Sequence, residues 1–486
     1  ETGFSIFTDT TGNVYTTGAF FGTIDFDPGP SVYTLSSIAG QNDVFISKLD
    51  ANGNFVWARS FSGTLNDAGT SIKVDAIGNV YITGYFQGTV DFDPGPGTYS
   101  LTSAGGLDIF VAKLDGSGNF VYALRIGDTG DDDPNCIQIT STGNIVVTGG
   151  FQASPDFDPG PGSFSLTSQG FYDVFVFSLD NSGNFLWAKS MGGTGSEGAS
   201  SLAFDSSGNI CVTGTYSGIV DFDPGPGTFT ISSIANSYDI FVFKISSSGN
   251  FIWAKSMGGN SNDYSNSITV DATDGIYTTG TFSTTADFDP GPGSFSLTSA
   301  GSEDIFISKL DGFGNFIWAL KFGSFQSDAG NSLVNDGFGN VYIIGGFQNT
   351  VDFNPGPGSF NLTAMNGSNA IFILKLDLLG NFIWAGSFGG LNNTSVFSIT
   401  LDSLGSIYST GWFAGTIDFD TGPGIYNLST LSGSIDMFIL KMAPCCAGIE
   451  QISNANILLQ LWPNPVVSDI NIEMRNGSSQ EISIQM

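Results

Sequence analysis

Thirteen aspartates recur in pairs along this chain of 486 residues. They belong to seven copies of the stretch Asp-Phe-Asp-Pro-Gly-Pro-Gly or a close variant, and the copies follow one another at intervals of 65 or 66 residues. These aspartates are Asp25, Asp27, Asp91, Asp93, Asp156, Asp158, Asp221, Asp223, Asp287, Asp289, Asp352, Asp418 and Asp420. Carboxylate oxygens are the ligands that Ca²⁺ prefers in proteins. The pairs are therefore candidate calcium ligands, and calcium is the one cofactor that we predict.

The same stretch also has the composition of an ordinary turn. Proline presets φ, glycine adopts positive φ, and aspartate accepts hydrogen bonds from nearby backbone N–H groups. A purely structural turn therefore stays open beside the calcium site. Asn354 replaces one aspartate in the sixth copy and Thr421 replaces the first proline in the seventh, so we expect these two copies to differ most from the rest.

The residue types present limit the possible catalytic chemistry. The chain contains no histidine, which excludes Ser-His-Asp and Cys-His catalysis as well as His-ligated zinc. Paired carboxylates could instead hydrolyse glycosides. However, the carboxylates here belong mostly to near-identical repeats, whereas a catalytic site needs one asymmetric group of residues. We therefore predict no catalytic residues and no enzyme, with a carbohydrate-active enzyme that uses paired carboxylates as the alternative.

Charge and hydropathy narrow the range of partners. Asp and Glu total 45 against 13 Lys and Arg, a formal net charge of −32, so the chain should repel nucleic acid. No apolar stretch reaches the roughly 18 residues of a membrane span, and we expect none. Eleven of the 13 cations occupy two recurring places in the repeat, which suggests that they pair with acids inside each unit.

Each copy of the aspartate stretch sits inside a unit that is rich in predicted strands. In the second unit, apolar or alternating runs at 71–75, 80–86, 108–114 and 120–124 predict four strands. Asp-x-x-Gly-Asn turns join the first strand to the second and the third to the fourth. We expect the fourth-strand tryptophans to pack between neighbouring sheets; they are Trp57, Trp187, Trp253, Trp318 and Trp384. Cys136 and Cys211 fall inside predicted strands, and no disulfide framework is indicated.

Seven such units predict an all-β protein, a seven-bladed β-propeller of four-stranded antiparallel blades over residues 1–446. In this architecture the connection from strand two to strand three lies on the same face as the blade-to-blade loops. We therefore expect that face to carry an exposed acidic ring. Its loop members would be Asp67, Asp128, Asp131, Asp132, Asp133, Glu197, Asp263 and Asp328.

The last blade is predicted to be incomplete. The first unit begins at its first strand and the seventh ends with its third, so six fourth strands serve seven blades. An open strand edge promotes aggregation. We expect either residues that precede Glu1 in a longer parent or residues 449–461 to fill the gap.

Within this pattern the units resemble the propeller repeats called SBBP repeats. The resemblance rests on runs such as Gly78-Asn79-Val80-Tyr81-Ile82-Thr83-Gly84 and Asp108-Ile109-Phe110-Val111-Ala112-Lys113-Leu114, and it covers roughly residues 1–443. It implies a secreted or cell-surface propeller and no single shared chemistry.

The composition changes after the last repeat. We predict a linker over 447–460 and a truncated β-sandwich-like tail over 461–486. Trp462, Pro463, Asn464 and Pro465 resemble the start of the C-terminal sorting domain of the type IX secretion system of Bacteroidota. This resemblance implies export to the cell surface and the type IX machinery as a partner.

These features together predict a secreted or cell-surface module for non-catalytic binding, adhesion or structural assembly, with calcium as a possible requirement. Its partner would be an extracellular glycan, a protein or another copy of the chain. A second alternative is a subunit of an extracellular polymer in which the incomplete blade takes a strand from a neighbouring chain.

Overall fold

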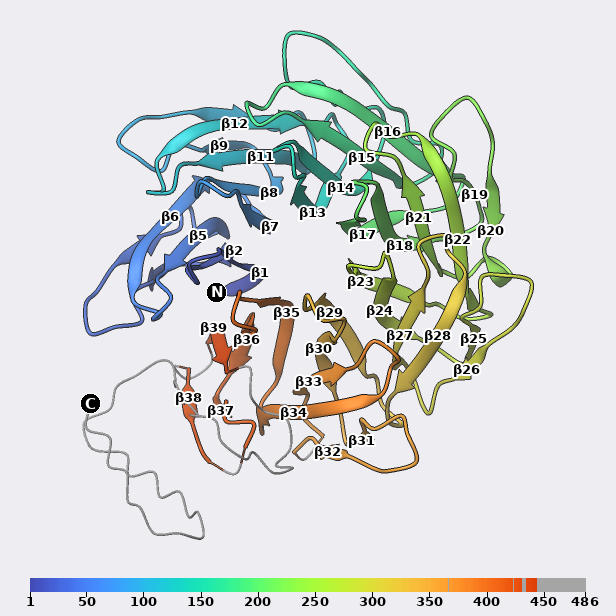
Figure 1. The fold of residues 1–486 in the computed structure, drawn as a ribbon. Helices are drawn as coiled ribbons and strands as arrows, with labels where there is room; N and C mark the ends of the chain where they lie inside the picture. Colours follow the sequence, from blue (N-terminus) through green and yellow to red (C-terminus); the bar gives the residue numbers. More distant parts are fainter. Residues whose placement is uncertain (366, 423, 431–433, 444–486) are drawn as a thin grey trace.

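Seven blades of antiparallel strands surround a central axis in the computed structural model (Figure 1). The structure describes residues 1–443 except 366, 423 and 431–433. The predicted all-β, seven-bladed propeller is confirmed for this part of the chain, in which the one helix is a single 3₁₀ turn, η1 (Ile234–Asn236). The described residues contain no helix with the length and apolar character that a bilayer-spanning segment needs. The linker at 447–460, the tail at 461–486 and Trp462, Pro463, Asn464 and Pro465 lie outside the described residues.

Six blades have four main strands and the seventh has three described strands. In blades one to three these are β1 (Thr2–Thr8), β2 (Val14–Phe20), β5 (Asp43–Leu49), β6 (Phe55–Gly63); β7 (Ala68–Val74), β8 (Val80–Phe86), β11 (Asp108–Leu114), β12 (Phe120–Ile126); and β13 (Asp132–Ile139), β14 (Ile145–Phe151), β15 (Asp173–Leu179), β16 (Phe185–Gly193). In blades four and five they are β17 (Gly198–Phe204), β18 (Ile210–Tyr216), β21 (Asp239–Ile245), β22 (Phe251–Gly259); and β23 (Tyr264–Val270), β24 (Ile276–Phe282), β27 (Asp304–Leu310), β28 (Phe316–Phe322). In blades six and seven they are β29 (Ala329–Asn335), β30 (Val341–Phe347), β33 (Ala370–Leu376), β34 (Phe382–Gly390); and β35 (Thr394–Leu401), β36 (Ile407–Ala414), β39 (Ile435–Met442).

A small hairpin follows the second strand of most blades and contains the Asp-Phe-Asp stretch. The hairpins are β3 (Thr23–Asp25) with β4 (Thr34–Ser36), β9 (Thr89–Asp91) with β10 (Ser100–Thr102), β19 (Ile219–Asp221) with β20 (Thr230–Ser232), β25 (Thr285–Asp287) with β26 (Ser296–Thr298), β31 (Thr350–Asp352) with β32 (Asn361–Thr363), and β37 (Thr416–Asp418) with β38 (Asn427–Ser429). In the third blade this hairpin is reduced to an isolated bridge between Asp156 and Ser165. The hairpins lie at the outer rim of the ring (Figure 1).

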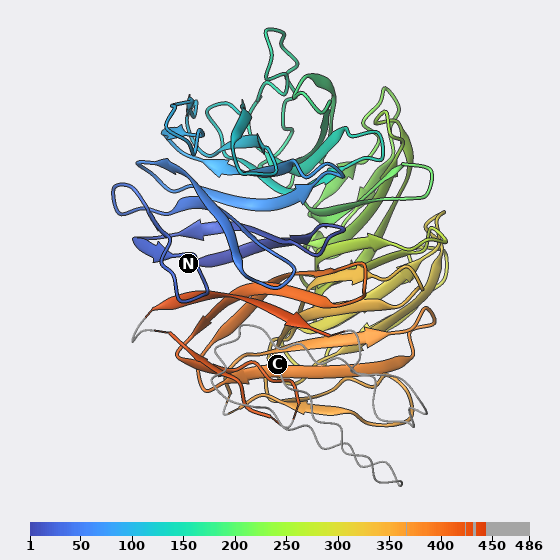
Figure 2. The ribbon, with the colours of Figure 1, turned by 60° about the vertical axis from the view of Figure 1, so that its left-hand side comes forward.

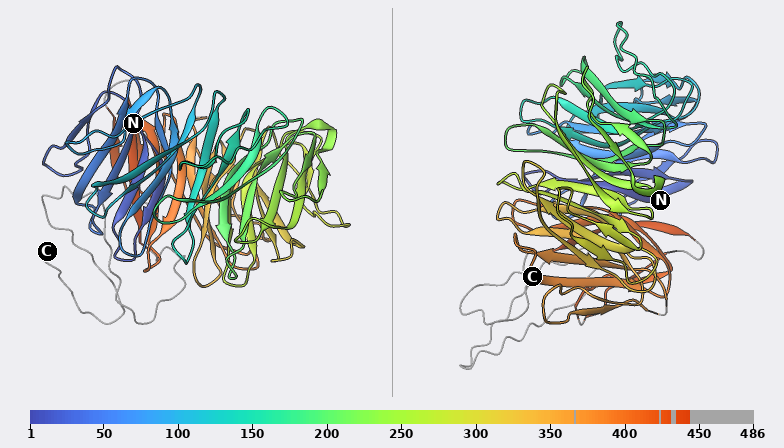
Figure 3. Two further views of the ribbon diagram at one scale, coloured as in Figure 1. Left: turned by 90° about the horizontal axis from the view of Figure 1, so that it is seen from above. Right: turned by 90° about the vertical axis from the view of Figure 1, so that its right-hand side faces the viewer.

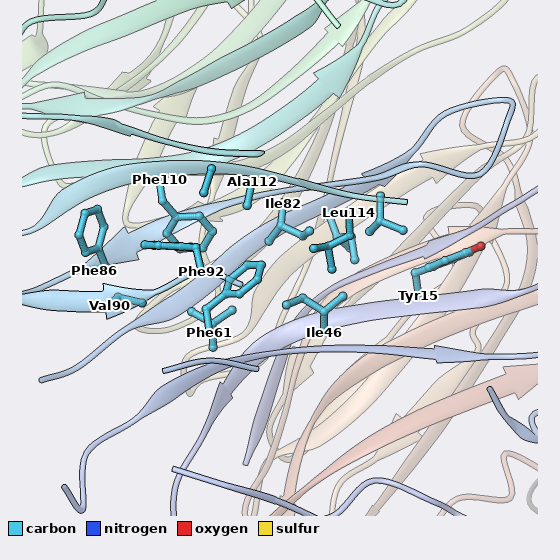
Figure 4. Packing of buried hydrophobic residues seen from close by; sticks show 14 of the residues in the cluster. Tyr15, Ile46, Phe61, Ile82, Phe86, Val90, Phe92, Phe110, Ala112 and Leu114 are labelled. Carbon is cyan, nitrogen blue, oxygen red and sulfur yellow. The ribbon is translucent and has the colours of Figure 1, made fainter. Parts of the chain in front are cut away.

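Burial explains why the second and third strands are apolar on both faces. Almost every residue of β8 and β11 is buried, because each blade is covered by a neighbour on either side. Side chains of the first and second blades meet in one cluster that includes Ile46, Phe61, Ile82 and Phe110 (Figure 4). The tryptophan prediction is confirmed for Trp57, which is buried in this cluster. Cys136 in β13 and Cys211 in β18 are buried free thiols, as expected.

The ring closes through packing between its first and last blades. The backbone N–H of Ile6 donates to Ser398 Oγ at 3.4 Å, and Thr8 Oγ1 donates to the Leu401 carbonyl at 2.9 Å. The first blade therefore lies beside the seventh (Figure 2), and the sheets stand side by side around the axis (Figure 3). Among the described residues β35, β36 and β39 form a three-stranded sheet, so the predicted incomplete blade is confirmed within these limits.

Candidate functional site

The predicted calcium ligands lie at the rim, where the first of each pair generally ends a hairpin strand and the second lies in the turn that follows. Asp91 Oδ1 accepts hydrogen bonds from the backbone N–H groups of Asp93 at 3.0 Å and Tyr99 at 2.8 Å. Asp93 Oδ1 accepts one from Gly95 at 2.8 Å. The same bonds recur at the other six copies, with Asn354 Oδ1 taking the place of the second aspartate in the sixth. One oxygen of each acid is therefore used by the turn itself.

The structure brings together the two acids within a turn, but it keeps the seven turns in separate blades. Among the described residues, no group of three or more His, Cys, Asp or Glu side chains is arranged to hold a metal ion. The backbone N–H of Phe360 holds the pKa of Asp352 below its ordinary value, so this carboxylate is ionised at neutral pH. Calcium binding at these turns stays a prediction.

Four of the hairpins also link two blades through strand pairing, which the sequence did not reveal. Asp91 and Val90 of β9 pair with Ser62 and Gly63 at the end of β6 in the preceding blade. The second residue of the Asp-Phe-Asp stretch, a phenylalanine, is buried in all seven copies. These residues are Phe26, Phe92, Phe157, Phe222, Phe288, Phe353 and Phe419. The Phe92 ring lies 5.1 Å from that of Phe61 in the first blade and 5.1 Å from that of Phe110 in the second. The stretch thus acts as a clasp between blades.

The expected acidic ring is wrong for five of its members. Asp67, Asp132, Glu197, Asp263 and Asp328 are buried with at most 1% of their surface exposed, and the backbone N–H of each donates to the carbonyl of the residue that precedes a third strand. Each lies beside a second buried acid at the start of a third strand. These second acids are Asp43, Asp108, Asp173, Asp239 and Asp304.

The pair between blades three and four shows the geometry. Glu197 Oε2 accepts a hydrogen bond from the Gly193 N–H at 3.0 Å, and Asp173 Oδ2 accepts one from Gln169 at 3.1 Å. The other two oxygens, Glu197 Oε1 and Asp173 Oδ1, are buried without a hydrogen-bond partner. Burial raises the pKa of Glu197 to about 8 and that of Asp173 to about 6. The nearby charge of Asp173 adds to the effect of burial on the pKa of Glu197.

This acid pair recurs from unit to unit and can be recognised in the sequence by its spacing. The two acids are 24 residues apart in all five units, as from Asp43 to Asp67. Burial raises the pKa of Asp67 and of Asp132 to about 8 as well. At the same positions of the sixth unit, Ala370 and Thr394 replace both acids together. The joint loss indicates that each acid depends on its partner.

The prediction that cations pair with acids inside each unit is confirmed at four places. Lys244 lies 2.6 Å from Asp205, and Lys309 lies 3.2 Å from Asp271. The remaining two pairs are Arg125 with Asp108 at 2.7 Å and Lys321 with Asp304 at 3.7 Å. These four cations therefore form ion pairs within the fold.

Four exposed apolar side chains lie at the ends of the blades that carry the Asp-x-x-Gly turns, and sequence reasoning missed them. The third residue of the last four Asp-x-x-Gly turns is large and apolar, and it is exposed: Phe313 by 78%, Phe338 by 91%, Leu379 by 70% and Leu404 by 79%. The equivalent residues of the nine earlier turns are Thr11, Asn52, Ile77, Ser117, Thr142, Ser182, Ser207, Ser248 and Thr273. Apart from Ile77, these residues are polar. Comparison of the turns position by position would have found the change.

These four turns share one face of the ring. In an antiparallel blade the 1–2 and 3–4 connections lie at the same end, and the four turns come from the consecutive blades five, six and seven. Blade five also contacts the 3–4 turn of blade six, because Lys309 Nζ donates to the Leu378 carbonyl at 3.3 Å. We call Phe313, Phe338, Leu379 and Leu404 the apolar turn patch.

Comparisons with known proteins agree with a repeat propeller and do not identify a family. No protein-family model matches the chain. The chain is 24% identical over 494 aligned positions to an uncharacterized WD repeat-containing protein of Acanthamoeba polyphaga mimivirus, which covers 85% of this chain and 35% of that protein. It is 26% identical over 147 positions to the regulatory protein FlaEY of Caulobacter vibrioides, which covers 30% of this chain and 15% of that protein. The chain thus matches about a third or less of the length of either relative.

Among solved structures, the extracellular domain of a putative hybrid two component system from B. thetaiotaomicron aligns with 85% of this chain and 79% of its own. The sequence identity is 11% and the TM-score is 0.15, so this likeness carries no argument.

Proposed function

We propose that this protein is a non-catalytic binding module that recognises a protein partner through the apolar turn patch. The observation that carries the proposal is the concentration of four exposed large apolar side chains on the last four described turns, where earlier turns carry mostly Ser or Thr. Several large apolar side chains exposed on one face favour an interaction site there. The similarity to a WD repeat-containing protein supports a binding or assembly role, since the propeller supplies the scaffold.

Charge indicates what kind of partner fits this surface. The carboxylates of Asp311 and Asp377 begin two of the four turns, and both have a pKa below the ordinary value because Asn315 and Asn381 donate to them against the effect of burial. The patch is thus bordered by ionised acids on a chain of net charge −32. A second copy would meet like charge, whereas a protein with apolar residues ringed by Lys and Arg would be attracted.

The proposal also includes a cellular location and a bound metal ion. We propose a secreted or cell-surface location and export by the type IX route of Bacteroidota, which rest on the resemblance of the repeats and of Trp462-Pro463-Asn464-Pro465 to exported proteins. We also propose that Ca²⁺ strengthens the rim through the second oxygens of the Asp-x-Asp turns, since the backbone uses one oxygen of each acid.

The binding proposal is tested by replacing the patch with the residues of earlier turns. The variant Phe313→Ser, Phe338→Ser, Leu379→Ser and Leu404→Ser is immobilised beside the native protein and the control Ile77→Ser, which removes an 85% exposed side chain from a turn of blade two. Proteins from the medium of the producing cells are captured on each and identified by mass spectrometry. We expect proteins that the native protein and the control retain and the fourfold variant loses, with retention that falls as salt increases.

Equal melting temperatures establish that the three proteins are folded. Identical captured sets on all three would contradict the proposal, because the patch would then make no contribution to recognition.

A further inference from the structure

A cavity of about 210 Å³ lies between the third and fourth blades. Its walls include Asp133 near the start of β13, Tyr172 just before β15, Gly198 at the start of β17 and Tyr238 just before β21. These residues adjoin the blade-to-blade loops and the connections from second to third strands, which share one end of an antiparallel blade. The apolar turn patch lies at the other end, so the cavity is a separate site.

Between the next two blades, an aromatic ring takes the equivalent place. Gly198 and Tyr264 hold the same register, since each begins a first strand and pairs with a threonine of the second strand. Tyr172 and Tyr238 are equivalent too, because the carbonyl of each accepts from the N–H of the buried loop acid, at 2.8 and 2.7 Å. The Tyr264 ring packs on the ring of Tyr238, with 5.8 Å between the ring centres and 30° between the planes.

Gly198 therefore leaves a space that a ring fills one blade later. A Cβ at Gly198 would meet no heavy atom within 4 Å beyond its chain neighbours. The second wall residue without a side chain is Gly150, where a Cβ would lie 3.3 Å from the Tyr172 ring. The two glycines leave room beside Tyr172 for a flat group similar in size to the tyrosine ring of the next blade.

The charge of the walls favours a cation. Asp133 is the one acid at its register in the described blades. The equivalent residues of the other units are Thr2, Ala68, Gly198, Tyr264, Ala329 and Ser395. Burial and the nearby charge of Asp131 raise the pKa of Asp133 to about 6, so this carboxylate is mostly ionised at pH 7.5. The described residues that line the cavity include no Lys or Arg to pair with it.

The walls also offer hydrogen-bond acceptors. Asp133 Oδ2 accepts from the Tyr172 hydroxyl at 3.5 Å, which holds the acid beside the ring. Ser196 and Thr215 contribute hydroxyl groups to the walls, and a hydroxyl oxygen can accept hydrogen bonds. Glu197 is another wall residue, and its Oε1 is buried without a hydrogen-bond partner. A ligand with several donors in one plane would match this arrangement.

We propose that this cavity binds a guanidinium group, the group that ends the arginine side chain. Its plane would pack on the Tyr172 ring, as Tyr264 packs on Tyr238, and its N–H groups would donate to the Asp133 carboxylate. A guanidinium is planar, stays charged and presents five donors, whereas an ammonium group has no plane to stack. A chain of net charge −32 also attracts cations from a distance. Free arginine and an exposed arginine of a partner protein both supply this group.

The test titrates the full chain of 486 residues with three probes by calorimetry, at low salt and pH 7.5. The probes are the N-acetyl amides of arginine, lysine and citrulline. Lysine keeps the charge without the plane, and citrulline keeps the plane without the charge. We expect one saturable site for the arginine probe and binding weaker by about tenfold or more for the other two. A capped Gly-Gly-Arg-Gly-Gly peptide that binds more tightly than free arginine would assign the site to a partner protein, and the reverse order would assign it to free arginine.

Two variants test whether the probe binds in the cavity. Gly198→Tyr copies the register of Tyr264 and should abolish binding by filling the space; Gly198 has no positive φ, so a side chain causes no backbone strain there. Asp133→Asn keeps the size of the side chain and should weaken binding by about tenfold or more. Glu303→Gln is the control, because it removes an acid at the register of Tyr238 one blade later, outside the cavity walls.

Equal melting temperatures establish that the variants are folded, and Asp133→Asn decides alone if Gly198→Tyr does not fold. Three results would overturn the proposal. The first is no saturable binding of the arginine probe by the native chain. The second is equal binding of the lysine or the citrulline probe, because the site would then not distinguish a guanidinium. The third is undiminished binding by the folded variants, which would place the bound probe elsewhere on the acidic surface.

Discussion

At the scale of single residues, the buried acid pairs are the least expected feature of this propeller. Their first members lie in loops that the sequence shows as polar and acidic, and loops normally lie at the surface. Nothing local distinguishes Asp67, which is buried, from Asp128, which is partly exposed. The difference is one of position in the fold: Asp67 directly precedes β7 and accepts a hydrogen bond from the Gln87 N–H, whereas Asp128 lies in the loop between β12 and β13.

The acid pairs predict an unusual dependence of stability on pH. Burial raises the pKa of Glu197 to about 8, so between pH 5 and 8 the folded state holds a proton that the unfolded state has released. The free energy of unfolding should therefore fall as pH rises through this window, by at most about 1.4 kcal/mol per pH unit for one group. Urea unfolding at pH 5, 6, 7 and 8 measures the slope.

The variant Glu197→Gln removes one titrating group and should make the slope shallower. Asp180→Asn is the control, because the Asn184 amide holds the pKa of Asp180 below its ordinary value and Asp180 stays ionised across the window. A Glu197→Gln protein with the slope of the native protein would show that Glu197 is ionised in the folded state.

At the scale of elements, the Asp-Phe-Asp hairpin has one feature that the sequence predicts and one that it does not. The sequence predicts the hydrogen bonds of its aspartates to the backbone, but it does not predict how its phenylalanine packs. Asp91 behaves as its place in a turn predicts. The burial of Phe92 could not be read from the repeat alone, because the ring packs against Phe61 of the preceding unit as well as against Phe86 and Phe110 of its own. The regular spacing of the repeat therefore predicted the hairpin. Its contact with the preceding blade follows only from the arrangement of the blades around the axis.

Replacing the clasp residue tests this role. Phe92→Ala removes a fully buried ring that contacts Phe61, Phe86 and Phe110, and it should lower the free energy of unfolding by about 3–5 kcal/mol. Urea denaturation measures the change. Phe313→Ala is the control, since that ring is 78% exposed and its loss should cost about 0.5 kcal/mol or less. Similar losses for the two variants would argue against the clasp.

Calcium binding by the aspartates of the same hairpins can be tested directly. Calorimetric titration of chelator-stripped protein with Ca²⁺ should show several bound ions and a raised melting temperature. The double variant Asp91→Asn and Asp93→Asn should bind one ion fewer than the native protein. The sixth turn already contains Asn354 and gives the natural comparison. If no heat is observed, the aspartates serve the turns alone.

At the scale of the whole molecule, the sequence predicted the number of blades because each unit repeats the same four strands. It could not predict how the ring closes, since closure depends on contacts such as Thr8 with Leu401, nearly four hundred residues apart. The apolar turn patch was missed for a related reason. Phe313 and Leu404 are 91 residues apart in the chain, and they share one face only because blades five to seven are neighbours.

The net charge of −32 makes the closed ring sensitive to salt. Like charges on a compact molecule repel one another, and salt screens this repulsion over about 10 Å at 0.1 M ionic strength. The melting temperature should therefore rise between 10 and 300 mM NaCl at pH 7. KCl at the same ionic strength should give the same rise, because screening does not depend on the identity of the cation. CaCl₂ at matched ionic strength should raise the melting temperature further if the rim turns bind the ion. A melting temperature that does not change with NaCl would contradict this prediction and would mean that repulsion between like charges does not limit the stability of the folded ring.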